Sequence, residues 1–426
     1  MPSAIFQRRS LRRLAAVSVF AVMLLGVGFR CLPAIAQAER QAVAAQPAPP
    51  AIKTQPDMDT TWRKLPIDAG QKKNRFKVRE ILRNGKFALG EEKILADYYR
   101  RYVLPGWSHL ANLTRLPDFR KDLRNDLMTG RIGGPPHDGL ANIVMNYLSK
   151  MAAANNIHPA ARVNAMLMVG ELNDKEPAGI SAPPVAMSAA LPVLIAAVNN
   201  PAQIDAVRIA ALIGIIRHVK FGALTPADRA AITAAMLKLA GTKTIPPGRS
   251  DAGHAWMRSL AAKALGLLGD PAGGVAKGLA AVAADSKAPL SARCEAANAL
   301  GQLRYRGFAG VNPSAMAAAL AKLVVDAVPA EGNPLSRPRL KYRLHCAWKG
   351  LTGVPDDDQR QGLESLAKAE PDHRAFVVRL KKAMQLTLDP FEIPNLDDEG
   401  LAEEIEEGRG ELQELLKKRP GKRRAG

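Results

Sequence analysis

The chain of 426 residues is 47% hydrophobic but only 5% aromatic, and its formal net charge is +20. This length is too great for one small core, so we expect several domains or a modular array. Alanine supplies much of the apolar content, which argues against a β-sandwich because strands favour β-branched and aromatic residues. The positive charge indicates a polyanionic partner or an anionic surface, and it says nothing about the fold.

Residues 1–36 have the three parts of a secretory signal peptide. A basic stretch (MPSAIFQRRSLRRL) precedes the apolar run 14–28, and Ala34 and Ala36 form a small-residue cleavage site. The alternative is an uncleaved membrane anchor, but an apolar run of about 15 residues is short for a span of roughly 20. Cleavage after Ala36 removes five arginines and no acidic residue, which leaves a net charge of +15. The sequence therefore predicts an exported protein of the periplasm, the cell envelope or the medium, and it leaves the export route open.

Two segments lie between the signal and the main part of the chain. Residues 37–60 are rich in alanine, proline and glutamine without a sustained period, which is typical of a disordered linker. Residues 61–135 hold much of the aromatic content. Within them the run GEEKILADYYRRYVLP begins with acids, spaces its apolar and aromatic residues at helical intervals and ends at Pro105. We expect a small, aromatic-rich helical cap here.

From residue 136 onward a short pattern recurs. Each close copy has an arginine, a glycine eight residues later and a leucine two residues after that, as in RVNAMLMVGEL (162–172), RSLAAKALGLL (258–268) and RCEAANALGQL (293–303). The looser copies are AVRIAALIGII (206–216), with its arginine at 208, and YRLHCAWKGLT (342–352), with its arginine at 343.

The spacing of these copies predicts helix pairs. Their glycines recur every 45 residues on average, at Gly170, Gly214, Gly266, Gly301 and Gly350. This spacing is typical of two-helix repeats and predicts an array of five to six pairs over 136–388. The partner helices are expected at 137–153, 185–198, 226–241, 273–284 and 313–327, several of them starting at a proline.

Each pair carries an apolar stripe that it cannot cover by itself. In RSLAAKALGLL, two alanines and two leucines fall at i, i+3, i+4 and i+7, and Gly266 lets another backbone approach. Successive pairs must therefore stack. The close copies resemble the HEAT-repeat family, and the whole layout resembles exported bacterial HEAT-repeat proteins. The resemblance implies an all-α fold, a right-handed α-solenoid of HEAT-like helix pairs with a small helical N-terminal cap, and it implies no particular activity.

The basic residues of the repeats have two interpretations. Arg162, Arg258 and Arg293 occupy one repeat position, where they form either a basic stripe or a structural ladder that bonds to carbonyls or acids of the adjoining repeat, as the resemblance implies. We favour the ladder. Other basic residues lie on or just after the second helices, which in such arrays usually line the concave face. The candidate ligand face consists of Arg208, Arg217, Lys220, Lys263, Arg304, Arg306 and Lys349.

Motifs for metal binding or nucleophilic catalysis are missing from the sequence, which has no HExxH, paired CxxC, EF-hand loop or GxSxG. We therefore expect no cofactor and no enzymatic role. His137-Asp138 after GGPP is interpreted as a helix start, and a ligand pair is the alternative. Cys294 and Cys346 fall in alanine-rich helical runs, where free cysteine usually behaves as a small buried residue. A disulfide between them is the alternative in an oxidising compartment.

Residues 389–426 form a charged C-terminal tail. Acids precede bases in DDEGLAEEIEEGRGELQELLKKRPGKRRAG, which suits a surface helix followed by a disordered basic end. We interpret this tail as a solvated terminus. The alternative is a segment that binds an anionic polymer through KKRPGKRR.

The expected function is that of a non-enzymatic, monomeric scaffold or binding protein. Its concave face would hold a protein or an anionic envelope polymer, and any membrane contact would come from an uncleaved signal or from peripheral charge. The first alternative is an enzyme or enzyme subunit with its site in the N-terminal head. The second is a nucleic-acid-binding HEAT array, which export disfavours.

Overall fold

The computed structural model describes residues 62–130, 133–178, 182–247, 249–331, 336–368 and 371–418. The predicted signal peptide with Ala34 and Ala36, the predicted linker and the last basic residues of the tail lie outside these ranges. In the described part 72% of the residues are helical and 1% lie in strands, which confirms the expected all-α class. None of the described helices combines the length and the apolar character that crossing a bilayer requires.

The head, residues 62–134, is built from short helices around Trp107. The Trp107 side chain is fully buried, and its ring centroid lies 6.4 Å from that of Phe119. The extended start of the head is fixed to this core, because the Leu65 amide donates a hydrogen bond to Ser108 Oγ at 2.8 Å. The elements in chain order are η2 (Ala69–Asn74), α2 (Arg75–Asn84), α3 (Glu91–Tyr98), the π-helix η3 (Tyr99–Val103), η4 (Pro105–Ser108), η5 (Leu110–Arg115) and α4 (Leu116–Thr129).

The amphipathic helix predicted in the head has two parts. It is α-helical as α3 and continues as η3, where a hydrogen bond of 3.0 Å joins the Leu104 amide to the Tyr99 carbonyl five residues before it. Pro105 then starts η4, since proline fits the first turn of a helix. Short π-helical segments occur frequently at functional sites.

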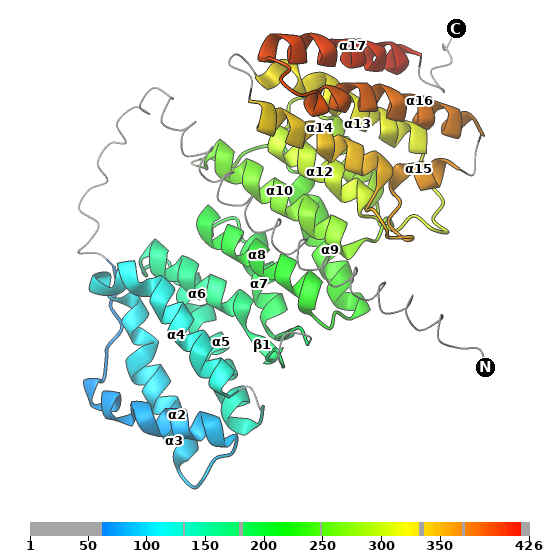
Figure 1. Cartoon of the computed structure of the whole chain (residues 1–426). Coiled ribbons are helices and arrows are strands. Elements are labelled where there is room, and N and C mark those ends of the chain that lie inside the picture. Colours follow the sequence, from blue (N-terminus) through cyan, green and yellow to red (C-terminus); the bar gives the residue numbers. More distant parts are fainter. Residues whose placement is uncertain are drawn as a thin grey trace, which may run out of the picture. The chain divides into compact units, whose positions relative to one another are not determined.

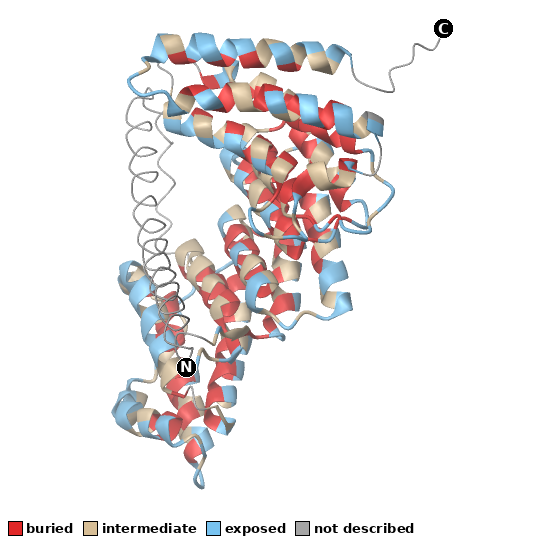
Figure 2. Cartoon of the chain, turned by 45° about the vertical axis from the view of Figure 1, so that its right-hand side comes forward, coloured by how far each residue is buried: buried red, intermediate tan, exposed pale blue. Residues whose placement is uncertain are grey.

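Five helix pairs follow the head. Each second helix packs against the first helix of its own pair, second helices of consecutive pairs pack against one another, and so do consecutive first helices. Buried residues run along the sides where helices meet (Figure 2). The pairs are α5 (Pro135–Ala153) with α6 (Pro159–Glu171), α7 (Ala190–Asn199) with α8 (Asp205–Phe221), α9 (Pro226–Gly241) with α10 (Asp251–Leu268), α11 (Val275–Ala284) with α12 (Leu290–Gly301), and α13 (Pro313–Ala327) with α14 (Arg337–Thr352) (Figure 1).

The predicted partner helices coincide with α5, α7, α9, α11 and α13 to within a few residues at their ends. The largest difference is at α7, which was expected from residue 185 and begins at Ala190. The residues just before it form β2 (Val185–Ala186), which pairs antiparallel with β1 (Asn173–Lys175) in the connection between α6 and α7. A tertiary pairing thus replaces the first turn that local sequence favours.

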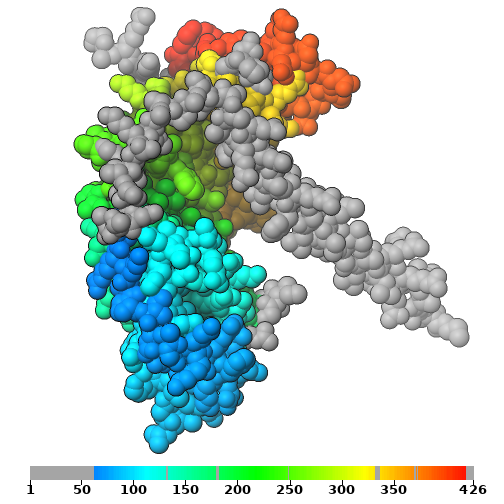
Figure 3. Space-filling model, turned by 90° about the vertical axis from the view of Figure 1, so that its left-hand side faces the viewer, coloured from blue at the N-terminus to red at the C-terminus, as the bar shows by residue number. Residues whose placement is uncertain are grey.

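The head packs directly on the first pair. Glu171 at the end of α6 pairs with two arginines of α4, Arg120 at 3.5 Å and Arg124 at 3.4 Å. In the space-filling view, the blue residues at the start of the head and the cyan residues that follow form a continuous surface (Figure 3). The head therefore packs against the array and is not a separate domain.

Glycines lie where the second helices approach most closely. A Cβ atom placed on Gly170 in α6 would lie 2.8 Å from the Cα atom of Gly214 in α8. A Cβ atom on Gly301 in α12 would overlap the carbonyl oxygen of Lys349, next to Gly350 in α14. Because the obstructing atoms belong to the backbone, a side chain at either glycine could be accommodated only if the two helices moved apart.

We predict that Gly301→Ala destabilises the protein by about 1–3 kcal/mol, since the added methyl group must push α12 and α14 apart. The matched control is Gly410→Ala in the last helix, where an added Cβ meets nothing within 4 Å. That control should raise stability by up to about 1 kcal/mol, because alanine favours helix. Denaturant unfolding of both variants tests this, and equal effects would contradict it.

The recurrent arginines bind the ends of the preceding first helices. In four pairs the arginine Nε donates to a backbone carbonyl in the last turn of the first helix or just after it, where the helix dipole is negative. In the fifth pair, Arg343 of α14 forms an ion pair with the buried carboxylate of Glu331 after α13. The four carbonyl bonds are Arg162 to Ala152 (3.2 Å), Arg208 to Val198 (3.0 Å), Arg258 to Ala240 (2.9 Å) and Arg293 to Ala283 (2.9 Å).

Two of these arginines also reach the next pair. Arg293 Nη2 lies 2.8 Å from Asp326 Oδ2 in α13, and Arg162 donates to the Gln203 side chain before α8. One side chain thus joins three helical segments, in a position where only 2% of the Arg293 side chain is exposed. Such a contact links consecutive pairs as well as capping one helix.

We predict that Arg293→Met lowers the free energy of unfolding by about 2–4 kcal/mol, since it leaves the Ala283 carbonyl and Asp326 without a buried donor. Arg306→Met, at an exposed position after α12, should change it by less than about 0.5 kcal/mol. Chemical denaturation of the two variants measures both values. A similar small loss in both would show that the buried contacts add little.

The C-terminal helices cover the last pair. The segments are α15 (Gly362–Ala367), α16 (Pro371–Leu388), η7 (Asp389–Glu392) and α17 (Asp398–Lys417). In α17 the apolar residues Leu401, Ile405 and Leu412 are buried, and the helix packs on α16 and α13. Arg409 Nε also donates to the Val325 carbonyl of α13 at 3.1 Å. The tail as far as Lys418 is therefore packed against the array, with its acids on the outer side.

Candidate functional site

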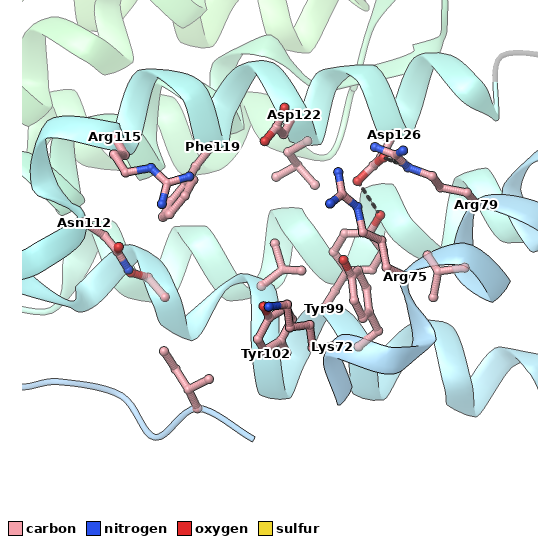
Figure 4. Close-up of a pocket in the computed structure, with 16 residues that line it drawn as sticks. Lys72, Arg75, Arg79, Tyr99, Tyr102, Asn112, Arg115, Phe119, Asp122 and Asp126 are labelled. Carbon is pink, nitrogen blue, oxygen red and sulfur yellow. Dashed lines mark hydrogen bonds and ion pairs between the residues drawn. The ribbon is translucent and has the colours of Figure 1, made fainter. Parts of the chain in front are cut away.

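A pocket in the head is lined by residues of seven helical elements and of the extended segment before them. Its volume is about 320 Å³. Figure 4 shows Arg115, Asn112 and Phe119 at one end, Arg75, Arg79 and Asp126 at the other, and Tyr102 and Lys72 between them. The residues that line it are Ile67, Lys72, Arg75, Val78, Arg79, Tyr98, Tyr99, Tyr102, Val103, Gly106, Asn112, Arg115, Phe119, Asp122, Leu123 and Asp126.

Helical spacing explains why these side chains converge. On α4 the lining residues Phe119, Asp122, Leu123 and Asp126 follow at intervals of three, one and three, which is one face of an α-helix. On α2, Arg75, Val78 and Arg79 are spaced in the same way. The opposite wall comes from the junction of α3 with the π-helix η3, which supplies the three tyrosines.

The lining carries more positive than negative charge. It contains four basic side chains and two carboxylates. Arg79 Nε lies 3.6 Å from Asp126 Oδ1. By contrast, Lys72, Arg75 and Arg115 form no ion pair with any residue that the structure describes. Three cations therefore face one cavity with no protein carboxylate bound to them.

The Asp126 carboxylate is held inside the pocket wall. The Tyr99 hydroxyl donates to Asp126 Oδ2 at 2.9 Å. Burial raises the pKa of Asp126 above its ordinary value, and the Tyr99 hydrogen bond and the Arg79 charge oppose that shift. Burial also raises the pKa of Tyr99 well above 10 and that of Tyr98 to about 12. The tyrosines thus stay protonated as donors, and Asp126 fixes Tyr99 in place.

The other end of the pocket combines an aromatic ring with a cation. Arg115 Cζ lies 5.3 Å from the centroid of the Phe119 ring, within cation–π distance. Asn112 donates to the Gly106 carbonyl at 2.9 Å, which fixes η5 to η4. The contact with the Phe119 ring orients the Arg115 guanidinium without neutralising its charge.

A second cavity, of about 290 Å³, has no such free charge. It is lined by residues of α9, α10 and α11. Its Lys243 pairs with Asp285 at 3.0 Å, and its Arg258 is bound to the Ala240 carbonyl. Because its ionic groups satisfy one another or the backbone, the head pocket is the better candidate for an anionic ligand.

The sequence-predicted ligand face divides into two groups. Arg208, Arg217 and Arg304 bond to backbone carbonyls, namely Val198, Gly170 with Leu172, and Leu268. The remaining members, Lys220, Lys263, Arg306 and Lys349, are exposed. Lys263 and Lys349 converge on Glu295 of α12, whose pKa burial raises while these two charges lower it. The predicted face is thus only partly available to a ligand.

His137 and Asp138 stand apart from the pocket. His137 is buried in the first turn of α5, with Nδ1 3.1 Å from Asp138 Oδ1 and Nε2 3.5 Å from Glu176 Oε1. The Glu176 side chain follows β1, so the histidine connects the start of α5 to the strand pair. Among the described residues, no three His, Cys, Asp or Glu side chains gather closely enough to hold a metal ion.

The basic residues of the head were not singled out from the sequence. The sequence does contain a pattern that could have indicated the pocket: Arg75 and Arg79 are four residues apart, and the lining residues of α4 share one helical face. That pattern becomes informative only once the two helices are known to face each other. Comparison of the chain with protein-family models, curated proteins and solved structures gives no match.

We predict that stability falls as the pH rises above about 6.5 and through the higher pKa of His137 in the folded protein. The Glu176 carboxylate beside Nε2 raises the pKa of His137 above 6.5, with burial opposing it. A group whose pKa is raised on folding stabilises fully below its unfolded pKa, and the benefit is lost as pH passes the folded value. Thermal melts of wild type and His137→Gln test this, and an unchanged pH profile in the variant would contradict it.

Proposed function

We propose that this chain is an exported binding protein in which a right-handed α-solenoid of HEAT-like helix pairs carries a head that holds an anionic ligand. The solenoid part of the proposal is supported by the order of contacts, since each second helix touches those of the preceding and following pairs. It is also supported by the glycines at these contacts and by the arginine bonds that recur in all five pairs.

The observation that carries the ligand proposal is the set of unpaired cations in the head pocket. Lys72, Arg75 and Arg115 line the pocket without an ion pair to a described residue, and all three are exposed, so water solvates them where no ligand is bound. Their like charges lie around one cavity, which attracts an anion to it. An anion that enters would gain charge-assisted hydrogen bonds from guanidinium groups.

The pocket is suited to an extended anion. Its free guanidinium groups lie at both ends, Arg115 at one and Arg75 at the other, with Tyr102 between them (Figure 4). A segment of a carboxylate- or phosphate-bearing polymer carries more than one negative charge, so it can contact both guanidinium groups. For an exported protein, an anionic polymer of the cell envelope is the ligand class that fits this arrangement.

The test is binding of polygalacturonate and of polyphosphate to the protein that starts at Gln37, measured by calorimetry with neutral dextran as the control polymer. We expect binding of at least one anionic polymer, weakened by salt. Arg75→Ala and Arg115→Ala should each reduce affinity roughly tenfold, since each removes one charge-assisted contact.

Charge-matched controls separate the pocket from the general basic character of the protein. Arg83→Ala on α2 and Lys121→Ala on α4 remove the same charge from the same helices outside the pocket lining. These controls should bind as wild type does. Equal weakening by pocket and control variants, or no binding of either polymer, would contradict the proposal.

A second candidate site is the exposed side of the second helices. On three of them an exposed apolar residue is followed seven residues later by lysine, which places both on one face. This face suits a protein partner that brings acidic and apolar groups together. In the same titrations, a loss caused by Lys263→Ala with Lys349→Ala and not by the pocket variants would favour it. The pairs are Ile213 with Lys220, Trp256 with Lys263, and Tyr342 with Lys349.

A further inference from the structure

Helices α12 and α14 approach each other more closely than a side chain between them would allow. A Cβ atom on Gly350 would lie 2.5 Å from the Ala297 carbonyl oxygen, and one on Gly301 would overlap the Lys349 carbonyl. The two helices run in the same direction, because Cys294 of α12 lies beside Cys346 of α14 and, further along both helices, Gly301 lies beside Gly350. At such a contact the Cα atoms of facing residues come within the range that a disulfide spans.

The two cysteines lie at the same level of this contact. Cys294 is one turn before Ala297, and Cys346 is one turn before Gly350. The two thiols lie close enough for each to be the main cause of the other's shifted pKa, and the residues are 1% and 3% exposed. Both thiols are free in this structure. The two cysteines belong to consecutive helix pairs, so only the stacking of these pairs brings them together.

The surroundings of the pair favour thiol–disulfide exchange. The neighbouring Cys346 thiol lowers the pKa of Cys294, and the charges of Arg343 and Arg293 act in the same direction against burial. The Cys294 sulfur, together with burial, raises the pKa of Cys346. One sulfur is therefore the better nucleophile, and its partner is placed beside it as the resolving thiol.

We propose that Cys294 and Cys346 form a disulfide that joins α12 to α14 in the exported protein. The Cys294 thiolate attacks one sulfur of a disulfide oxidant, such as oxidised glutathione or an exchange protein of the oxidising compartment, and releases the first thiolate. Cys346 then loses its proton and attacks Cys294 Sγ, which breaks the mixed disulfide and releases the second thiolate. Two thiols are oxidised, one external disulfide is reduced, and the two protons end on the released thiols.

The third cysteine does not compete in the mature chain. Cys31 belongs to the segment that the predicted cleavage removes, and it is the only other cysteine of the sequence. Because both remaining sulfurs are buried, exchange takes place as the chain folds or when α14 opens. The bond closes a loop of more than fifty residues, for which the chain-entropy treatment gives a large stabilisation.

The test uses the full chain with Cys31→Ser, unfolded and refolded in a mixture of reduced and oxidised glutathione. We expect both thiols to become unreactive and the mass to fall by about 2 Da. Trypsin should release one linked product, in which CEAANALGQLR (294–304) is joined to LHCAWK (344–349). The melting temperature should exceed that of the same chain kept reduced by roughly 5 °C.

Two controls define the outcomes. Cys294→Ser and Cys346→Ser, each in the Cys31→Ser chain, should show no difference in melting temperature between oxidising and reducing conditions. The comparison of oxidised with reduced chain needs no substitution in the pair, so poor folding of a serine variant does not affect it. Two reactive thiols after refolding, absence of the linked peptides, or an oxidised form that melts at or below the reduced one would overturn the proposal. Neither outcome depends on the ligand of the head pocket.

Discussion

Contact between helix backbones is the constraint on which the rest of this structure depends. At Gly170 with Gly214, and again at Gly301 with Gly350, no side chain separates two successive second helices. The alanine-rich stripes on either side can then pack closely, which is how short side chains build a dense core. The close approach of the second helices also fixes where along them each arginine contacts a helix end and where Cys294 lies beside Cys346.

The array holds the head in position, and the two parts differ in how their helices are arranged. Repeated helices supply stability by burying apolar faces in order, whereas the head uses six helical elements, a π-helix and an extended segment to enclose one cavity. Its polar contacts are individual, as in the Tyr99–Asp126 bond. Glu171 joins the two parts through Arg120 and Arg124. The cavity with the unpaired cations thus lies in the irregular part, and the regular part holds that part in place.

Local sequence predicted the helices of the array well because their determinants are local. Proline at the first turn, apolar periodicity and the glycine signature act within one or two turns, and α9 and α13 begin and end where expected. The head pocket could not be predicted, because Arg75, Arg115 and Tyr102 become neighbours only through tertiary packing. For the same reason the shifted arginines looked degenerate, although Arg208 binds the end of the preceding helix as the close copies do and Arg343 pairs with Glu331 just after it.

The last helix has a consequence for self-association. In a stack of similar helix pairs, the last pair exposes the apolar face that each earlier pair buries against its neighbour. A second molecule could bind to such an exposed face and extend the stack. Here α17 lies over that face, with Leu401, Ile405 and Leu412 turned inward and glutamates turned to the solvent. This end of the row of helices therefore presents glutamates to the solvent in place of an apolar helix face.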